Sequence, residues 1–275
     1  MALVTDKFAM VTGGGTGLGY AIAQRLLEEG AACVTIVGRR QDVLAEAAVK
    51  LKALGAAGEV RYAVADVTDE AAMVAAVDQA CNGGGALDIL VANAGTGFPS
   101  PVIEADIDAW RSMLELNVVG TLISIKSAAQ KMKKGGGSIV TISSIEGAAP
   151  TKWMGSYSTS KAGMEMLSQC AARELGHFGI RVNCVRPGMV PTEIVAASIP
   201  QTMQDHYVEK AQIQRLGTPR DIADGVLYFA SNASDWVTGQ TINICGGAGN
   251  RVGDDYSEAV SAFYGEDKLR EYLNQ

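Results

Sequence analysis

A tyrosine and a lysine stand four residues apart in the stretch YSTSK, at Tyr157 and Lys161. If this stretch begins a helix, the two side chains lie one turn apart on the same helix face. A phenol loses its proton near pH 10, and an ammonium group at ~4 Å favours the phenolate by up to about 4 kcal/mol at an effective dielectric constant of 20. The pair could therefore act as a general acid or base. Taken alone, it could equally be an incidental pair on a solvated helix surface.

A second candidate site is the glycine-rich segment VTGGGTGLG, which follows an expected strand and opens an expected helix. Glycines there let backbone amides and the positive end of a helix approach a pyrophosphate. The spacing is Gly13-x3-Gly17-x-Gly19 instead of the strict GxGxxG pattern. The segment predicts a dinucleotide site, with contacts from Thr12, Gly13, Thr16, Gly17, Leu18 and Gly19.

The end of the second expected strand indicates which dinucleotide binds, since a carboxylate there would hold the ribose 2′-hydroxyl. The chain instead reads Gly38, Arg39 and Arg40. An arginine would attract a 2′-phosphate through a charge-assisted pair, so NADP(H) is favoured and NAD(H) is the alternative. The two arginines could also merely cap a surface turn. Asp66, followed by Val67, is expected to contact the adenine.

Composition limits the class of protein. Of 275 residues, 48% are hydrophobic and 19% are charged, which predicts a large buried core. The net charge of -7 argues against nucleic acid or an anionic membrane as the main partner. No apolar run approaches the ~20 residues that cross a bilayer, and no signal segment is evident, so we expect a cytoplasmic protein.

The cysteines show no metal-ligand spacing, and no metal site is expected. Their scattered positions and apolar neighbours predict buried free thiols in a reducing compartment. They are Cys33, Cys81, Cys170, Cys184 and Cys245.

The elements that must position these residues alternate along the chain. Strands are expected at 8–12, 33–38, 60–64, 89–92, 138–142, 181–185 and 241–244. Helices are expected at 17–30, 41–54, 69–81, 109–134, 157–175 and 220–231. The alternation predicts an α/β fold, a doubly wound (Rossmann) parallel sheet with helices on both faces and ligands at the carboxyl ends of the strands.

One domain is expected over residues 1–249. Two segments exceed the simple alternation: 189–216, expected to be a substrate-loop insertion, and the C-terminal extension 250–275. The extension carries an apolar stripe that we expect to dock near a subunit contact and to shape the pocket mouth. The stripe consists of Ala259, Val260, Phe263, Tyr264, Leu269, Tyr272 and Leu273.

Six motifs follow one another along the chain. They are the glycine-rich loop, NAG at 93–95, LNVVG at 116–120, ISS at 142–144, YSTSK at 157–161 and RPGMVPT at 186–192. With this ordered set, the sequence resembles the short-chain dehydrogenase/reductase family over about its first 249 residues. The resemblance implies a seven-stranded Rossmann sheet, a homotetramer or homodimer, and reversible hydride transfer between NAD(P) and a carbonyl or secondary alcohol.

The resemblance also implies roles for individual residues. The catalytic group would be Asn117, Ser144, Tyr157 and Lys161. Ser144 would donate to the substrate oxygen that Tyr157 protonates, although the strand pattern alone would also allow Ser143. In the family, the asparagine bends its helix and holds a water that links the lysine to solvent. Further cofactor contacts would come from Asn93, Ala94, Gly95, Pro187, Gly188, Val190 and Thr192.

Apolar loop residues predict a hydrophobic substrate, which would be an alicyclic, steroid-like or 3-oxoacyl ketone or alcohol. The candidates are Phe98, Trp153, Met154, Ile194, Val195, Met203 and Tyr207, some of which could instead belong to the core or to an interface. Glu146, two residues after Ser144, could be a polar substrate contact or a solvent-facing loop residue.

Other functions fit the sequence less well. A serine hydrolase would need a nearby histidine and a GxSxG turn, and the chain has neither the turn nor more than two histidines. A sensor or scaffold that binds a dinucleotide without turnover would not need Ser144, Tyr157 and Lys161 together. An enoyl reductase would be expected to show a wider spacing between tyrosine and lysine. The sequence therefore predicts carbonyl–alcohol chemistry.

Overall fold

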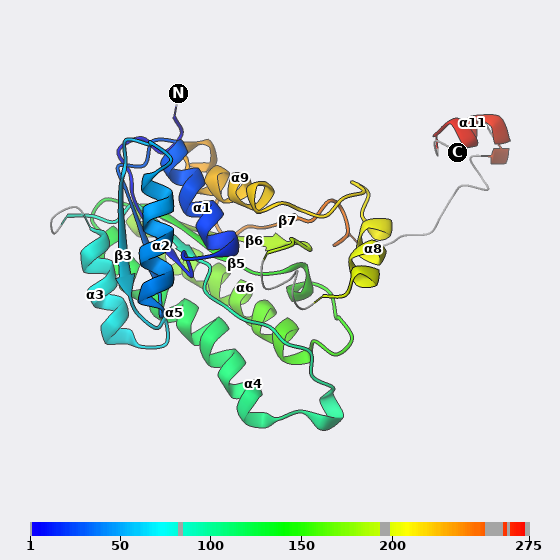
Figure 1. Ribbon diagram of the computed structural model, residues 1–275, viewed down its shortest axis with the longest axis horizontal. Coiled ribbons are helices and arrows are strands. Elements are labelled where there is room, and N and C mark those ends of the chain that lie inside the picture. The colour runs from blue at the N-terminus through cyan, green and yellow to red at the C-terminus, as the bar shows by residue number, and fades with distance from the viewer. Residues whose placement is uncertain (1, 82–84, 193–198, 251–260, 263–264, 273–275) are drawn as a thin grey trace.

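The computed structural model describes residues 2–81, 85–192, 199–250, 261–262 and 265–272. Its centre is one sheet of seven parallel strands in the order β3-β2-β1-β4-β5-β6-β7 (Figure 1). The strands are β1 (Phe8–Thr12), β2 (Cys33–Gly38), β3 (Glu59–Val64), β4 (Ile89–Ala92), β5 (Gly137–Ile142), β6 (Ile180–Pro187) and β7 (Thr241–Ile244). The predicted doubly wound α/β fold is confirmed, and each strand begins and ends within two residues of its expected bounds.

Helices cover both faces of the sheet (Figure 1). The helices with described bounds are α1 (Gly17–Glu28), α2 (Gln41–Lys52), α3 (Glu70–Ala80), α4 (Ile107–Leu114), α5 (Gly120–Met132), α6 (Gly155–Leu175), α8 (Gln201–Lys210), α9 (Pro219–Ala230) and α11 (Glu266–Tyr272). Alternate residues of β1 enter different cores, since Val11 packs under α1 and α9 whereas Met10 packs under α3 and α5. Burial on both sides explains why the central strands β1, β2, β4 and β5 are largely apolar along their whole length.

The strand order reverses between β1 and β4, and the loops after these two strands diverge to opposite faces of the sheet. Such a switch point is where doubly wound sheets bind ligands. The glycine-rich segment follows β1, and Asn93-Ala94-Gly95 follows β4. The topology thus places two of the predicted cofactor motifs side by side at one edge of the sheet.

Three sequence expectations need correction. The helix expected at 109–134 is divided into α4 and α5 by the π-helical turn η2 (Glu115–Val119), where Asn117 lies. Helix α8 lies within 189–216, for which no helix was expected. Cys170 is exposed, because it lies on the outer face of α6, whereas the other four cysteines are buried as expected; all five are free.

The C-terminal extension is described only in part. Helix α11 lies apart from the sheet in Figure 1. Of the apolar stripe, Ala259, Val260, Phe263, Tyr264 and Leu273 lie outside the described residues. Docking of the extension at a pocket mouth therefore stays a prediction. Among the described residues, no helix is both long enough and apolar enough to cross a membrane.

Candidate functional site

The glycine-rich loop forms a cradle that leaves no room for side chains. Gly13 and Gly17 have φ values of +64° and +55°, in the left-handed region that favours glycine. A Cβ atom on Gly19 would overlap the carbonyl oxygen of Gly13. Thr16 is the N-cap of α1 but makes no side-chain capping bond, so the first amides of α1 have no such partner. This backbone surface fits a pyrophosphate at a helix N-terminus.

The loop after β4 is bonded to the cradle. Thr12 Oγ1 accepts hydrogen bonds from the backbone N–H groups of Asn93 and Ala94, both at 3.0 Å. Asn93 Nδ2 in turn donates to the carbonyl oxygen of Thr12 at 2.9 Å. The Asn93 amide group is therefore occupied by backbone, and it holds the two loops in register.

An ion pair joins the segment after β2 to the segment after β3, where the sequence predicts the adenine contact. Arg39 Nη1 lies 3.8 Å from Asp66 Oδ2, and the side chain of Arg39 is 71% exposed. Asp66 Oδ1 accepts from the backbone N–H and the hydroxyl of Thr68, which lowers the pKa of the Asp66 carboxyl. Arg40 is the N-cap of α2, and Val67 is buried against Gly120. The strand β2 thus ends in Gly38 and is followed by two exposed arginines, one of which pairs with Asp66.

The segment after β6 folds back over the cradle. A Cβ atom on Gly17 would lie 3.3 Å from Thr192 Cγ2, so these two distant positions are neighbours. The Thr192 N–H donates to the Val190 carbonyl oxygen at 2.8 Å, while the Val190 side chain is buried in the core. The Tyr207 hydroxyl packs against Gly188, which follows Pro187, and it would overlap a Cβ atom at that position.

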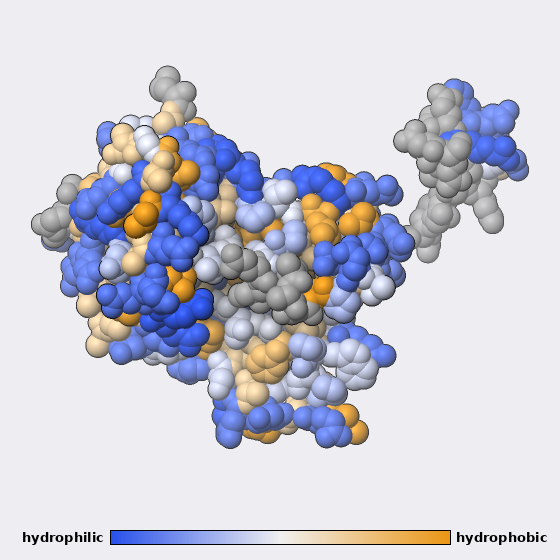
Figure 2. Space-filling model, viewed as in Figure 1, coloured by the Kyte–Doolittle hydropathy of each residue, from blue (hydrophilic) through white to orange (hydrophobic). Residues whose placement is uncertain are grey.

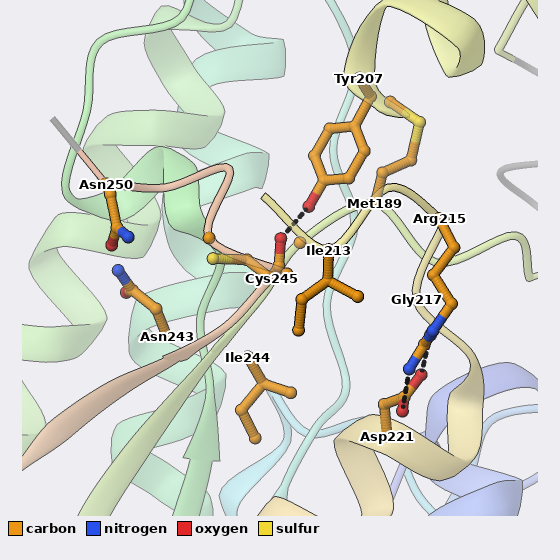
Figure 3. Close-up of a pocket in the computed structure, with 13 residues that line it drawn as sticks. Met189, Tyr207, Ile213, Arg215, Gly217, Asp221, Asn243, Ile244, Cys245 and Asn250 are labelled. Carbon is orange, nitrogen blue, oxygen red and sulfur yellow. Dashed lines mark hydrogen bonds and ion pairs between the residues drawn. The ribbon is translucent and has the colours of Figure 1, made fainter. Parts of the chain in front are cut away.

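Tyr207 belongs to a separate hollow of about 410 Å³ between α8 and the end of β7 (Figure 3). Its hydroxyl donates to the Cys245 carbonyl oxygen at 2.9 Å. Arg215 and Asp221 pair at the other side of the hollow. The lining includes Gly188 but none of Ser144, Tyr157 or Lys161. Tyr207 therefore faces this hollow instead of the candidate catalytic group.

The candidate catalytic group forms where β5 ends and α6 begins. Helix α6 stacks Tyr157 and Lys161 on one face, as their spacing predicts, and the Lys161 ammonium lies 5.6 Å from the centre of the Tyr157 ring. Lys161 is only 4% exposed and donates to the Ile142 carbonyl oxygen at 2.8 Å. Gly97 packs on the tyrosine, since a Cβ atom there would lie 2.6 Å from the ring.

Two adjacent serines at the end of β5 point in different directions. Ser143 Oγ donates to Glu165 Oε1 at 2.6 Å, within the protein. Ser144 caps η3 (Ile145–Gly147), accepts from the Glu146 N–H at 3.2 Å and hydrogen-bonds Tyr157. The structure therefore leaves Ser144 as the hydroxyl beside the tyrosine, and the alternative Ser143 lies elsewhere.

The expected phenolate is not favoured in the chain alone. Burial raises the pKa of Tyr157 to about 12, the Ser144 hydrogen bond opposes this shift, and the charge of Glu146 adds to it. Burial likewise lowers the pKa of Lys161 to about 8. An effective dielectric constant of 20 applies to a partly solvated pair, whereas this pair is buried and desolvation is the largest influence on the tyrosine. Tyr157 is therefore a neutral phenol at neutral pH.

Asn117 is fully buried and ties three segments together. Its Nδ2 donates to the Thr96 carbonyl oxygen and to Ser160 Oγ, both at 2.9 Å, and its Oδ1 accepts from the Thr96 N–H at 3.0 Å. A Cβ atom on Gly95 would lie 3.0 Å from Asn117 Oδ1 and 3.4 Å from Lys161 Nζ. The π turn thus brings the asparagine close to Lys161, across Gly95.

Sequence reasoning missed an ionic network beneath this group. Glu165 accepts from Arg186 Nε at 2.7 Å and pairs with Arg186 Nη2, and the two side chains are 6% and 20% exposed. Ser160, which was assigned no role beyond its small size, holds Asn117. The sequence held one signal, because Glu165 continues the four-residue spacing of Tyr157 and Lys161 on one helix face.

The predicted substrate residues do not gather at one place. Trp153 has a φ of +71°, is 51% exposed and stacks under Lys152. Met154 forms a bridge with Ser100, which ties the start of α6 to the lobe that carries η1 (Val102–Glu104) and α4. Figure 2 shows apolar surface on this lobe. Phe98 is half-buried, Met203 is exposed, and Ile194 and Val195 lie outside the described residues.

Residues 13–249 match a family described as Enoyl-(Acyl carrier protein) reductase. Cis-4-hydroxycyclohexanecarboxylate dehydrogenase of Sinomonas cyclohexanicum is 38% identical over 245 residues, which cover 88% of this chain and 96% of the relative. The structure of a short-chain type dehydrogenase/reductase from Mycobacterium ulcerans has a TM-score of 0.87 at 39% identity and covers 98% of both chains. A 7α-hydroxysteroid dehydrogenase solved with NADH and 7-oxo glycochenodeoxycholic acid has a TM-score of 0.85 at 34% identity, and the match covers 90% of this chain and 95% of that one.

Proposed function

The chain belongs to the short-chain dehydrogenase/reductase family and acts on CH–OH groups; we propose that it is an NADP(H)-preferring enzyme that interconverts a carbonyl and a secondary alcohol on a hydrophobic small molecule. The observation that supports this most is the meeting of Ser144, Tyr157 and Lys161 beside the glycine cradle. A protein that only bound a dinucleotide would have no use for that group.

The catalytic residues have different roles at the reacting oxygen atom of the substrate. In reduction, the substrate carbonyl gains a hydride at carbon and a proton at oxygen, and the proton comes from the Tyr157 hydroxyl. Ser144 holds the same oxygen by a hydrogen bond that strengthens as negative charge develops. In oxidation, the alcohol loses the same hydride and proton. The nicotinamide ring of a bound cofactor supplies or accepts the hydride.

In the chain alone, Tyr157 is protonated and so can act as the proton donor for reduction. Tyr157, with a pKa of about 12, carries the proton that a ketone must receive. Oxidation requires its phenolate, which the positive charge of an oxidised nicotinamide would favour. Lys161, bonded to the Ile142 carbonyl, holds its ammonium beneath the tyrosine ring and can stabilise that phenolate.

Double-bond reduction is the rival reaction, since the matching family carries an enoyl reductase description. The four-residue spacing from Tyr157 to Lys161 favours carbonyl chemistry. Purified protein should therefore oxidise NADPH with a cyclic ketone, such as 4-methylcyclohexanone, and not with a 2-enoyl thioester. The reverse result would overturn the proposed reaction.

The NADP(H) preference is supported by Arg39 and Arg40 directly after β2, which ends in Gly38 and not in an acidic residue that would repel a 2′-phosphate. The 7α-hydroxysteroid dehydrogenase was solved with NADH, so the two cofactors must be compared directly. Arg39→Ala should lower the preference for NADPH over NADH about tenfold. Arg111→Ala removes another exposed arginine and should leave the preference unchanged. If Arg39→Ala keeps the same preference for NADPH over NADH, Arg39 does not bind the 2′-phosphate.

The substrate class is a hydrophobic alicyclic or steroid-like ketone or alcohol. The support comes from the apolar lobe at the start of α6 and from the relatives, one named for a hydroxycyclohexane carboxylate and one solved with an oxo bile acid. A panel of cyclic ketones, steroid ketones and 3-oxoacyl thioesters, assayed with both cofactors, would rank these classes by kcat/KM.

A further inference from the structure

The turn that carries Ser144 also carries a carboxyl group whose bonding is incomplete. Glu146 lies in η3, two residues after Ser144. Its Oε2 atom is enclosed and has no hydrogen-bond partner among the described residues. Buried polar atoms in folded proteins are nearly always hydrogen-bonded, because an unmet bond costs about 1–3 kcal/mol. Glu146 Oε2 is therefore suited to a partner that the described chain does not supply.

The three residues of η3 face different parts of the molecule. Ile145 lies against Gly249, since a Cβ atom on that glycine would be 2.9 Å from Ile145 Cγ2. Gly147 lies over the Glu165 carboxylate, where a Cβ atom would overlap Oε1. Glu146 is the residue between them, and its backbone N–H donates to Ser144 Oγ at 3.2 Å. The turn thus keeps Glu146 beside the serine that would bind the reacting oxygen.

We propose that Glu146 accepts a hydrogen bond from a second hydroxyl group of the substrate, so that the enzyme selects diols and hydroxyketones over compounds whose only polar group is the reacting one. This inference rests on the oxidoreductase function proposed above. It assigns the substrate class more narrowly, as an apolar ring with a hydroxyl near the reacting carbon.

The selectivity follows from the state of the carboxyl group. With a diol, the second hydroxyl donates to Glu146 while Ser144 and Tyr157 hold the reacting oxygen. With a simple alcohol, the enclosed oxygen stays without a partner, and sites built to bond a hydroxyl discriminate strongly against analogues that lack it. A substrate carboxylate at this position would be repelled by the like charge.

The test compares trans-cyclohexane-1,2-diol with cyclohexanol, which share the ring and the reacting group. The wild-type protein should show a kcat/KM for the diol about tenfold or more above that for cyclohexanol. Glu146→Leu should lower this ratio about tenfold, and Glu146→Gln, whose amide oxygen still accepts a hydrogen bond, should retain part of it. Glu46→Gln, an exposed carboxylate on α2, is the matched control and should keep the full ratio.

Two outcomes would overturn the proposal. One is a ratio of kcat/KM for the diol to that for cyclohexanol that is the same in the wild type and in Glu146→Leu. The other is a shifted pH profile in both Glu146 variants with the ratio intact, which would mean that Glu146 acts only through its charge on Tyr157.

A binding measurement separates this proposal from the proposed function. If neither alcohol is turned over with NADP⁺ or NAD⁺, the oxidoreductase function fails for these compounds, and melting temperature becomes the readout. In Tyr157→Phe with cofactor present, the diol should raise the melting temperature more than cyclohexanol does. Adding Glu146→Leu should remove that difference. No extra rise with the diol would reject the second-hydroxyl contact.

Discussion

The cofactor side and the catalytic side of the candidate site are formed by different parts of the chain. The cofactor cradle is formed by backbone, with Gly13 and Gly17 at positive φ and Gly19 pressed against a carbonyl oxygen. The catalytic side is formed by buried side chains, of which Lys161 donates to a carbonyl and Glu165 pairs with Arg186. Shape defines the first side, and buried charge defines the second.

This difference predicts opposite sensitivities. A cradle of backbone amides is disturbed when an atom is added, because neighbouring backbone cannot move aside. A network of buried polar groups is disturbed when an atom is removed, because the partner then loses its compensation in a low dielectric. Substitutions that add atoms to one side or remove them from the other should therefore separate cofactor binding from catalysis.

The largest expected effect is on the catalytic side. Tyr157→Phe removes only the hydroxyl that carries the proton, so kcat should fall about 10²- to 10⁴-fold. NADPH affinity, measured by fluorescence titration, should change little because the cradle is untouched. Ordinary turnover in this variant would show that another group moves the proton.

The next effect tests the ionic network. Glu165→Leu leaves Arg186 largely buried without its partner and should lower the free energy of unfolding by about 3 kcal/mol in urea titrations. Glu46→Gln breaks an exposed pair with Lys50 and should change it by less than about 0.5 kcal/mol. If both variants lose the same free energy of unfolding, the buried Glu165–Arg186 pair stabilises the protein no more than the exposed pair does.

A smaller effect is expected in the cradle. Gly19→Ala adds a methyl group where it would overlap Gly13, which should lower the free energy of unfolding by about 1–3 kcal/mol and weaken NADPH binding. Gly135→Ala places the same group where no atom lies within 4 Å and serves as the control. A cofactor affinity in Gly19→Ala that matches the control would show that the cradle can widen.

The smallest effect is a pH dependence from Lys161. The folded-state pKa of about 8 lies below the ordinary lysine value of 10.5, so the unfolded chain binds more protons above pH 8 and stability rises with pH there. Cys184, with a pKa raised to about 11 from 9.0, has the opposite effect above pH 9. The free energy of unfolding of the cofactor-free protein should therefore rise by about 1 kcal/mol from pH 8 to 9 and then stop rising.

Two variants check the origin of this rise. Lys161→Met should abolish it, because no group is left to titrate in that window. Lys126→Met, which removes an exposed lysine paired with Glu70, should retain it. A rise that persists in Lys161→Met would assign the titration to another residue.

Much of this protein was determined by local sequence. The alternation of apolar strands and periodic helices predicted the seven strands, because each element must bury its own face whatever its neighbours are. The spacing of Tyr157 and Lys161 predicted their stacking, because helix geometry alone sets it. The glycines of the cradle were found for the same reason, since positive φ and close backbone approach are properties of single positions.

Tertiary structure alone decided which groups face one another and how deeply they lie. It turned Ser143 toward Glu165, formed the π turn at Asn117, exposed Cys170 and enclosed Glu146 Oε2 without a hydrogen-bond partner among the described residues. It also reversed the expected direction of the Tyr157 pKa, because desolvation depends on residues such as Gly97 that are sixty positions away in sequence. Spacing along a helix is local, whereas burial is the sum of contacts from the whole chain.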